Sequence, residues 1–133
     1  MVKKIIQTKG KRKRAIARAT LRVGKGKIRF NKIPLDIVNP KLLRMKLREP
    51  LLLADDTAKM VDIDVSVFGG GIVSQADAAR LAIAKALVQF NKKLENVFLK
   101  YDRQLLVADV RRKEPCKPNR HGKARAKRQK SYR

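Results

Sequence analysis

Two features of this sequence have the residue types and spacing to do chemistry: a run of three glycines, and dense clusters of Lys and Arg. Gly69, Gly70 and Gly71 follow an alternating apolar and polar stretch and precede an alanine-rich one. Strand, glycine turn and helix in this order are typical of phosphate-binding loops. The Walker form needs Gly-Lys-Ser or Gly-Lys-Thr, whereas Ile72 and Val73 follow here. The sequence therefore favours a tight packing turn and leaves a nucleotide loop as the minor alternative.

The elements on either side of the glycines have clear periods. Residues 61–68 alternate Val or Ile with Asp or Ser, which predicts a strand with one buried face. The glycines end this strand, because residues without Cβ adopt positive φ at low cost. Ser74 predicts a helix N-cap, and the helix that follows runs from Gln75 to Phe90. Its apolar stripe and many alanines predict close packing on a sheet; the stripe consists of Ala76, Ala79, Ile83, Ala86, Leu87 and Phe90.

The charge balance limits the function. Among 133 residues, 35 are Lys or Arg and 11 are Asp or Glu, for a net charge of +24. All the acids lie between Asp36 and Glu114, so both ends of the chain carry unopposed positive charge. A surplus of this size needs a polyanion as partner, and nucleic acid is the commonest one.

The first basic cluster lies at residues 9–14, where Gly10 predicts a hinge. Because the cluster joins directly to an alternating strand at residues 15–23, we expect it to be held in place and to contact phosphates. Arg18 and Arg22 fall on the outer face of that strand, and small residues fall on its inner face. Gly24-Lys25-Gly26 predicts a tight turn that brings residues 27–30 back as the partner strand of a β-hairpin.

The remaining stretches predict smaller elements. Pro34 and Pro40 bracket a short turn or helical piece, and residues 40–54 predict a helix broken near Pro50. Residues 94–102 predict a short helix, and residues 105–108 a last edge strand. Residues 111–133 show no apolar period, so they predict an extended tail.

Catalytic and metal-binding groups are scarce. Asp62 and Asp64 form the only close pair of acids on one side of an element, and we expect them to meet Lys or Arg on a strand face. Cys116 and His121 are the only residues of their types, so neither a disulfide nor a His/Cys metal cluster is expected, nor any cofactor. No stretch has the length of an apolar membrane span or the pattern of a signal peptide, which favours a cytoplasmic protein with no membrane partner.

Three separate parts of the sequence match the motifs of one known family. The family signature is matched by Gly69, Gly70, Gly71, Ser74, Gln75, Ala78, Ala82, Ala84, Lys85, Ala86 and Leu87. The family's start is matched by Gly10, Lys11, Arg12, Lys13, Ala15, Ala17, Gly24, Lys25, Gly26, Lys27, Ile28 and Asn31. Its end is matched by Asp109, Arg111, Glu114, Gly122, Lys123, Ala124, Arg125, Lys130, Ser131, Tyr132 and Arg133. With these motifs the sequence resembles the small ribosomal subunit protein nine family, archaeal and eukaryotic type.

The resemblance implies an α+β fold: a mixed four-stranded sheet packed with helices, with a left-handed β-α-β crossover, as in the second domain of ribosomal protein five of the same subunit. It also implies a globular RNA-binding domain at residues 1–108 and an extended basic tail at residues 109–133. The implied partners are small-subunit ribosomal RNA in the subunit head, neighbouring head proteins, and the anticodon stem-loop of the P-site transfer RNA.

Carried over by position, the resemblance and the basic clusters give two sets of binding residues. The ribosomal RNA set is Lys9, Lys11, Arg12, Lys13, Arg14, Arg18, Arg22, Lys117, Arg120, Lys123, Arg125 and Lys127. The transfer RNA set is Arg128, Lys130, Tyr132 and Arg133.

Two other classes of function stay open at this point. Charge alone equally allows a free-standing protein that packages DNA or RNA, although such a protein gains little from a glycine-anchored alanine helix. The implied fold is also shared with certain small-molecule kinases, but their serine-rich phosphate loop and catalytic acid have no counterpart after Gly71. We therefore expect a structural protein of translation and no enzyme.

Overall fold

The computed structural model describes residues 5–119, 124–125 and 131. Its elements in chain order are β1 (Ile6–Arg12), β2 (Ala15–Val23), β3 (Ile28–Phe30), β4 (Ile33–Pro34), η1 (Leu35–Ile37), α1 (Lys41–Ala54), α2 (Asp56–Lys59), β5 (Val61–Phe68), α3 (Ile72–Phe90), α4 (Leu94–Tyr101) and η2 (Arg103–Leu105). The expected α+β class and the short helical piece between the two prolines are confirmed.

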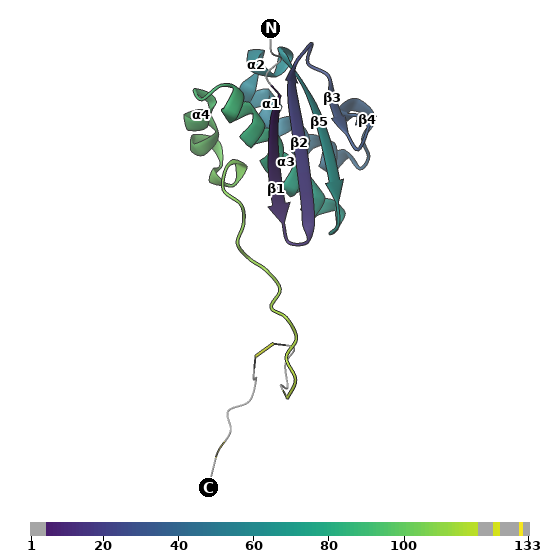
Figure 1. Cartoon of the computed structure of the whole chain (residues 1–133), viewed down its shortest axis with the longest axis vertical. Helices are drawn as coiled ribbons and strands as arrows, with labels where there is room; N and C mark the ends of the chain where they lie inside the picture. Colours follow the sequence, from purple (N-terminus) through teal and green to yellow (C-terminus); the bar gives the residue numbers. More distant parts are fainter. Residues whose placement is uncertain (1–4, 120–123, 126–130, 132–133) are drawn as a thin grey trace.

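The sheet is mixed, and its strand order is β1-β2-β5-β3-β4. β1, β2 and β5 pair antiparallel, whereas β3 runs parallel to β5. The sheet has five strands where four were expected, because the two-residue β4 adds to the free edge of β3. Figure 1 shows the strands in front and the helices α1 and α3 behind them. The other face of the sheet is therefore left open.

The predicted hairpin between residues 15–23 and 27–30 is wrong. β2 pairs with β1 on one side and with β5 on the other, so β5 separates it from β3. The Gly24-Lys25-Gly26 turn instead crosses the start of β5, where the Gly24 N–H donates to the Met60 carbonyl at 2.9 Å. The hairpin that does form joins β1 to β2 through the two-residue turn Lys13-Arg14.

Asp62 stabilises the turn at the point where the chain crosses the start of β5. Its Oδ1 accepts hydrogen bonds from the backbone N–H groups of Lys27 at 2.8 Å and Lys25 at 2.9 Å. The bond from Lys27 has the larger effect and the bond from Lys25 the next, and together they lower the pKa of the Asp62 carboxyl. One carboxylate therefore accepts hydrogen bonds from two backbone amides of the turn.

The core lies between the sheet and α3, and small residues let the two approach closely. Every residue of the predicted stripe of α3 is buried except the partly buried Phe90. Gly10 is not a hinge: it lies within β1, where a Cβ would come 2.0 Å from the Ala78 carbonyl oxygen of α3. Thr8 of the same strand donates to the Ala82 carbonyl at 2.7 Å. β1 therefore lies almost in backbone contact with the helix.

Two smaller predictions are also wrong. α1 continues through Pro50, because this proline is buried in the same face as Leu47 and Leu51, and its packing offsets the missing N–H bond. The apolar residues at 105–108 do not form a strand. Leu105 instead ends η2 and is fully buried.

The last helix and the start of the tail agree with the sequence pattern. α4 covers Leu94–Tyr101, as predicted, and buries Leu94 and Phe98. From Val110 to residue 119 the chain is exposed and contains no helix or strand. Figure 1 shows this segment leaving the core at the end where the β1–β2 turn lies.

Candidate nucleic-acid interface

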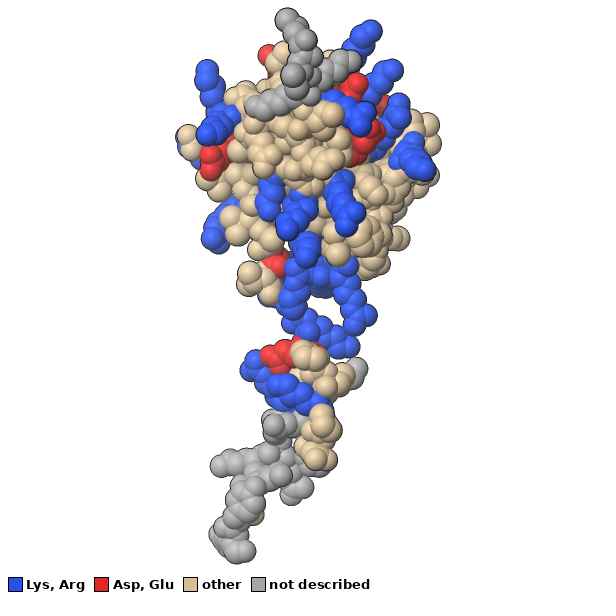
Figure 2. Space-filling model, in the orientation of Figure 1, with Lys and Arg blue, Asp and Glu red and all other residues tan. Residues whose placement is uncertain are grey.

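The open face of the sheet carries a group of cations on β1 and β2. Side chains alternate along both strands, so Lys9 and Lys11 of β1 and Arg18 and Arg22 of β2 are exposed on this face. Lys9 lies directly opposite Arg18 in the strand register. Like charges placed opposite one another destabilise a sheet. Figure 2 shows Lys and Arg side chains gathered here and below, where the tail leaves the core.

The acids of the same face lie on β5, nearer the other edge. Asp64 lies opposite Arg29 in the register, with 4.0 Å between Arg29 Nε and Asp64 Oδ1, so this acid meets a cation as expected. Asp62 lies opposite Arg22. Within the described part of the chain, no ion pair involves Lys9, Lys11, Arg18 or Arg22. The β1–β2 side of the face is therefore the unneutralised side.

An aromatic ring lies within this cationic surface and was not singled out from the sequence. Phe68, at the end of β5, is 49% exposed, and the Arg18 guanidinium carbon lies 5.6 Å from its ring centroid. A cation over a ring is a favourable contact that holds both groups in place. The signal in the sequence was the alternation of β5 itself, which puts Phe68 on the same face as Asp64 and Ser66.

Arg12 belongs to the basic cluster in sequence but lies on the other face of β1. Its guanidinium contacts the carboxylate of Asp109, and its Nε lies 3.8 Å from Asp77 Oδ2 of α3. The side chains of Arg12 and Asp109 are only 19% and 9% exposed. Lys46 of α1 also reaches Asp77, at 2.6 Å. This group of charges joins β1, α1, α3 and the start of the tail.

A second ionic group lies at Arg80. Its Nε lies 2.7 Å from Glu49 Oε2, and its Nη2 lies 2.7 Å from Asp102 Oδ2. Burial raises the pKa of Asp102, but hydrogen bonds from the Gln104 N–H and from Arg80 outweigh this effect and hold the pKa below its ordinary value. Arg80 is thus neutralised within the chain, as Arg12 is.

The glycine turn has a different cap from the predicted one. Gly69 and Gly70 adopt positive φ of 73° and 67°, and a Cβ at Gly70 would come 2.9 Å from the Ala15 backbone. Gly71 is the N-cap of α3, with no side-chain cap, so Ser74 lies inside the first helical turn. Gln75 closes the loop by donating its side-chain amide to the Gly69 carbonyl at 3.1 Å.

The tail residues of the predicted site are described only in part. Lys117 is exposed, and Arg125 Nε donates to Glu114 Oε2 at 2.9 Å, so Arg125 is partly neutralised. These contacts lower the pKa of Glu114 and raise that of Arg125. The other tail residues of the two predicted sets lie outside the described residues: Arg120, Lys123, Lys127, Arg128, Lys130, Tyr132 and Arg133.

Other kinds of site find no support in the described residues. Across residues 5–119, 124–125 and 131 there is no group of three or more His, Cys, Asp or Glu side chains placed to hold a metal ion. In the same part of the chain, no helix has the length and apolar character needed to cross a membrane.

An α+β domain with one helix-covered sheet face, one open cationic face and a basic tail is typical of polyanion-binding proteins. The family model described as ribosomal protein S9/S16 matches residues 10–133. The chain is 56% identical over 133 residues to small ribosomal subunit protein uS9 of Methanococcus maripaludis, an alignment that covers 98% of this chain and 99% of that protein. It is 55% identical, over the same shares, to the protein of that name from Methanococcus vannielii.

The chain therefore belongs to the ribosomal protein S9/S16 family. The resemblance inferred from the three sets of motifs is confirmed, and these archaeal relatives confirm the archaeal type.

Proposed function

We propose that this protein is a structural constituent of the small ribosomal subunit that binds ribosomal RNA through the open face of its sheet. Family membership and the names of the relatives support the assignment to this subunit. The observation that carries the binding surface is the pair Lys9 and Arg18, placed opposite one another on adjacent strands. Such a pair costs folding free energy in the free protein, and RNA phosphates would offset that cost.

The proposed interface has two parts. The first is the open face with the β1–β2 turn, comprising Lys9, Lys11, Lys13, Arg14, Arg18 and Arg22. The second is the basic tail, residues 109–133, with Lys117, Arg120, Lys123, Arg125 and Lys127. Arg12 serves the interface indirectly, because its contacts with Asp109 and Asp77 hold the start of the tail against the core.

The end of the tail has a separate proposed role. We assign Arg128, Lys130, Tyr132 and Arg133 to the anticodon stem-loop of the P-site transfer RNA, with the globular domain of residues 1–108 in the subunit head beside neighbouring head proteins. The support is family membership and the absence of any acid after Glu114 in the sequence.

We also propose that the β3–α1–α2–β5 connection is the left-handed crossover that the family resemblance implies. We propose the cytoplasm as the compartment of the protein.

Sedimentation tests the main proposal. A tagged copy of the protein in cell extract should travel with small subunits at low magnesium and stay with them through a moderate salt wash. Replacing Lys9, Lys11 and Arg18 by Gln should move protein toward the top of the gradient. A packaging protein would instead sediment with bulk RNA or DNA of many sizes, and that outcome would contradict the proposal.

A truncation tests the role of the tail's end. Deleting residues 130–133 should leave melting and subunit assembly unchanged and weaken transfer RNA binding to the P site by about 1–3 kcal/mol, if one or two charge-assisted contacts are lost. Filter binding to subunits with and without the four residues makes the measurement. Equal affinities would contradict the proposed transfer RNA contact but not the proposed ribosomal RNA interface.

A further inference from the structure

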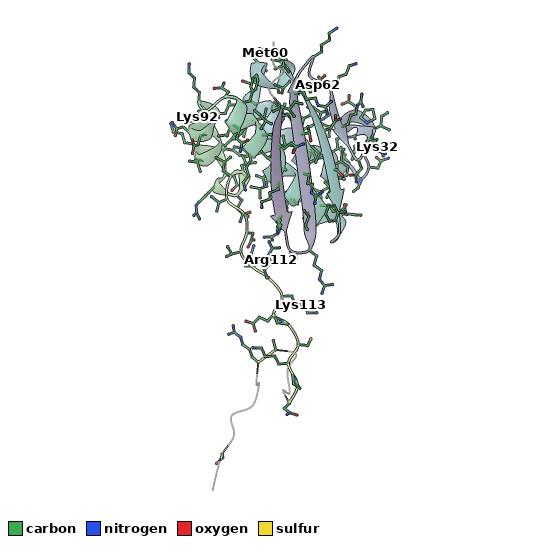
Figure 3. All side chains as sticks on the ribbon, viewed as in Figure 1. Lys32, Met60, Asp62, Lys92, Arg112 and Lys113 are labelled. Atoms are coloured by element: carbon green, nitrogen blue, oxygen red, sulfur yellow. The ribbon has the colours of Figure 1, made fainter. Side chains whose placement is uncertain are left out.

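Three segments that are far apart in sequence line an open cavity of about 770 Å³ at the end of the core. Its walls are the β1–β2 turn with Lys13 and Arg14, the glycine turn with Gly70, Gly71 and Ser74, and the tail from Arg111 to Cys116. Figure 3 shows the labelled Arg112 and Lys113 just below the β1–β2 turn. The volume lies within the range of about 300–1,000 Å³ found for pockets that bury small organic ligands.

Many of the residues that line this cavity are cationic. Five of its lining residues are Lys13, Arg14, Arg111, Arg112 and Lys113, against the single acid Glu114. Glu114 is already paired with Arg125, and Arg111 is paired with Asp109. Lys13, Arg14 and Lys113 are exposed, and the described part of the chain offers them no ion pair. Three cationic side chains around one cavity raise the positive potential there, and an anion that enters it would reduce their mutual repulsion.

The tail wall is attached to the core by specific contacts. Arg12 contacts Asp109, whose side chain is 9% exposed, just before the tail reaches the cavity. Within the cavity wall, the Arg112 guanidinium donates a hydrogen bond to the Lys13 carbonyl. These two contacts place the cations of the tail across from those of the turn, so that both sides can reach one ligand.

The glycine wall leaves room for that ligand. A Cβ at Gly71 would meet nothing within 4 Å, and the chain there is exposed. The first turn of α3 begins in the same wall, and its partial positive charge adds to that of the side chains.

We propose that this cavity binds backbone phosphates of a ribosomal RNA segment that passes between the start of the tail and the core. The proposal deepens the proposed function and rests on it, because it takes small-subunit RNA as the ligand. It adds a defined site in which Lys113, Arg112 and Arg111 of the tail act together with Lys13 and Arg14 of the β1–β2 turn.

Matched triple variants test the cavity. The first replaces Lys13, Arg14 and Lys113 by Gln, and the control replaces the exposed Lys92, Lys93 and Lys100 by Gln on the flank formed by α4. Figure 3 shows Lys92 well away from Lys113. Both variants lose three charges from exposed positions, so both should unfold at the parent's temperature.

The measurement is the affinity for small-subunit ribosomal RNA as a function of salt. Each phosphate contact contributes about 0.7–0.9 to the slope of log affinity against log salt. The cavity variant should therefore lose about 2 from the slope, and the control less than about 0.5. Equal losses in the two variants would contradict RNA binding in the cavity, but would not contradict RNA binding by the rest of the protein. A parent with no salt-dependent RNA affinity would overturn the proposed function itself.

A crosslinking experiment gives an independent result. Cys116 is the only cysteine of the chain, is exposed and lines the cavity, so a photoactivated crosslinker attached there probes the site directly. In reconstituted small subunits it should crosslink to one short RNA segment, and the cavity variant should lose or displace that crosslink. Crosslinks to protein alone, in subunits that contain the labelled protein, would overturn the proposal.

Discussion

Lys11 and Arg12 are neighbours in the same basic cluster, yet the two faces of β1 give them opposite surroundings. Lys11 is exposed on the open face and forms no ion pair among the described residues. Arg12 lies on the covered face, where Asp109 and Asp77 neutralise it. The period of the strand, more than the density of charge, therefore decides which cations remain available for RNA. The covered face holds the fold and the tail together, and the open face is left for the ligand.

The largest expected effect comes from the tightest contact on the covered face. Gly10→Val should destabilise the protein by roughly 3 kcal/mol, because its Cβ would overlap the Ala78 carbonyl oxygen of α3. Denaturant unfolding measures the loss. Gly71→Ala is the control, since open space surrounds its Cβ and φ is −101°, so it should cost less than about 1 kcal/mol. Similar losses in the two variants would mean that β1 and α3 do not pack this closely.

The comparison of the two neighbouring cations can be tested directly. Arg12→Gln should lower stability by about 1–2 kcal/mol, because it removes a mostly buried guanidinium from the carboxylates of Asp109 and Asp77, which keep only Arg111 and Lys46 as cationic partners. Lys11→Gln should leave stability within about 0.5 kcal/mol of the parent, since it breaks no contact within the described chain.

RNA binding should show the reverse order. Lys11→Gln should reduce the salt slope by about 0.7–0.9, and Arg12→Gln should leave it nearly unchanged. Calorimetric melting measures the stability of each variant, and RNA titrations at several salt concentrations measure its salt slope. If Arg12→Gln lowered the slope as much as Lys11→Gln, Arg12 would contact RNA in the complex, and the division between the two faces would be wrong.

The elements with strong periods could be predicted from the sequence, and their partners could not. β5 and α3 follow directly from alternation and from the alanine stripe, which are local properties. The turn at residues 24–26 signals a change of direction, but nothing local shows that β5 would insert between β2 and β3. The acceptor that stabilises the actual path, Asp62, lies more than thirty positions further along the chain.

The candidate site was predictable to a similar extent. The exposed cations Lys9, Lys11, Arg18 and Arg22 follow from the strand period, which also assigns Arg12 to the opposite face once β1 is known to reach Arg12. The composition of the basic cluster does not distinguish Arg12 from the exposed cations, because nearly all of residues 9–14 are Lys or Arg. The acids that neutralise Arg12 come from α3 and from the chain after η2. No spacing within the cluster could have shown them.

The smallest expected effect concerns the Arg80 group and its dependence on pH. The pKa of Asp102 is lowered in the folded protein, so the unfolded state binds more protons than the folded state at acid pH. The stabilisation from this carboxylate is complete above the unfolded pKa, near 4, and is lost as the pH falls through the lower folded value.

Asp102→Asn should therefore lower stability at pH 7 and make little difference near pH 2. Because the side chain is 33% exposed, solvent screening limits the difference at pH 7 to about 1 kcal/mol or less. Melting of the parent and of Asp102→Asn across this pH range makes the measurement. Equal stabilities of the parent and of Asp102→Asn from pH 7 to pH 2 would show that Asp102 acts through its hydrogen bond to the Gln104 N–H, which an amide oxygen can also accept, and not through its charge beside Arg80. Arg80 would then have only Glu49 as an effective counter-charge, and the covered side of the molecule would carry more unneutralised positive charge than its geometry indicates.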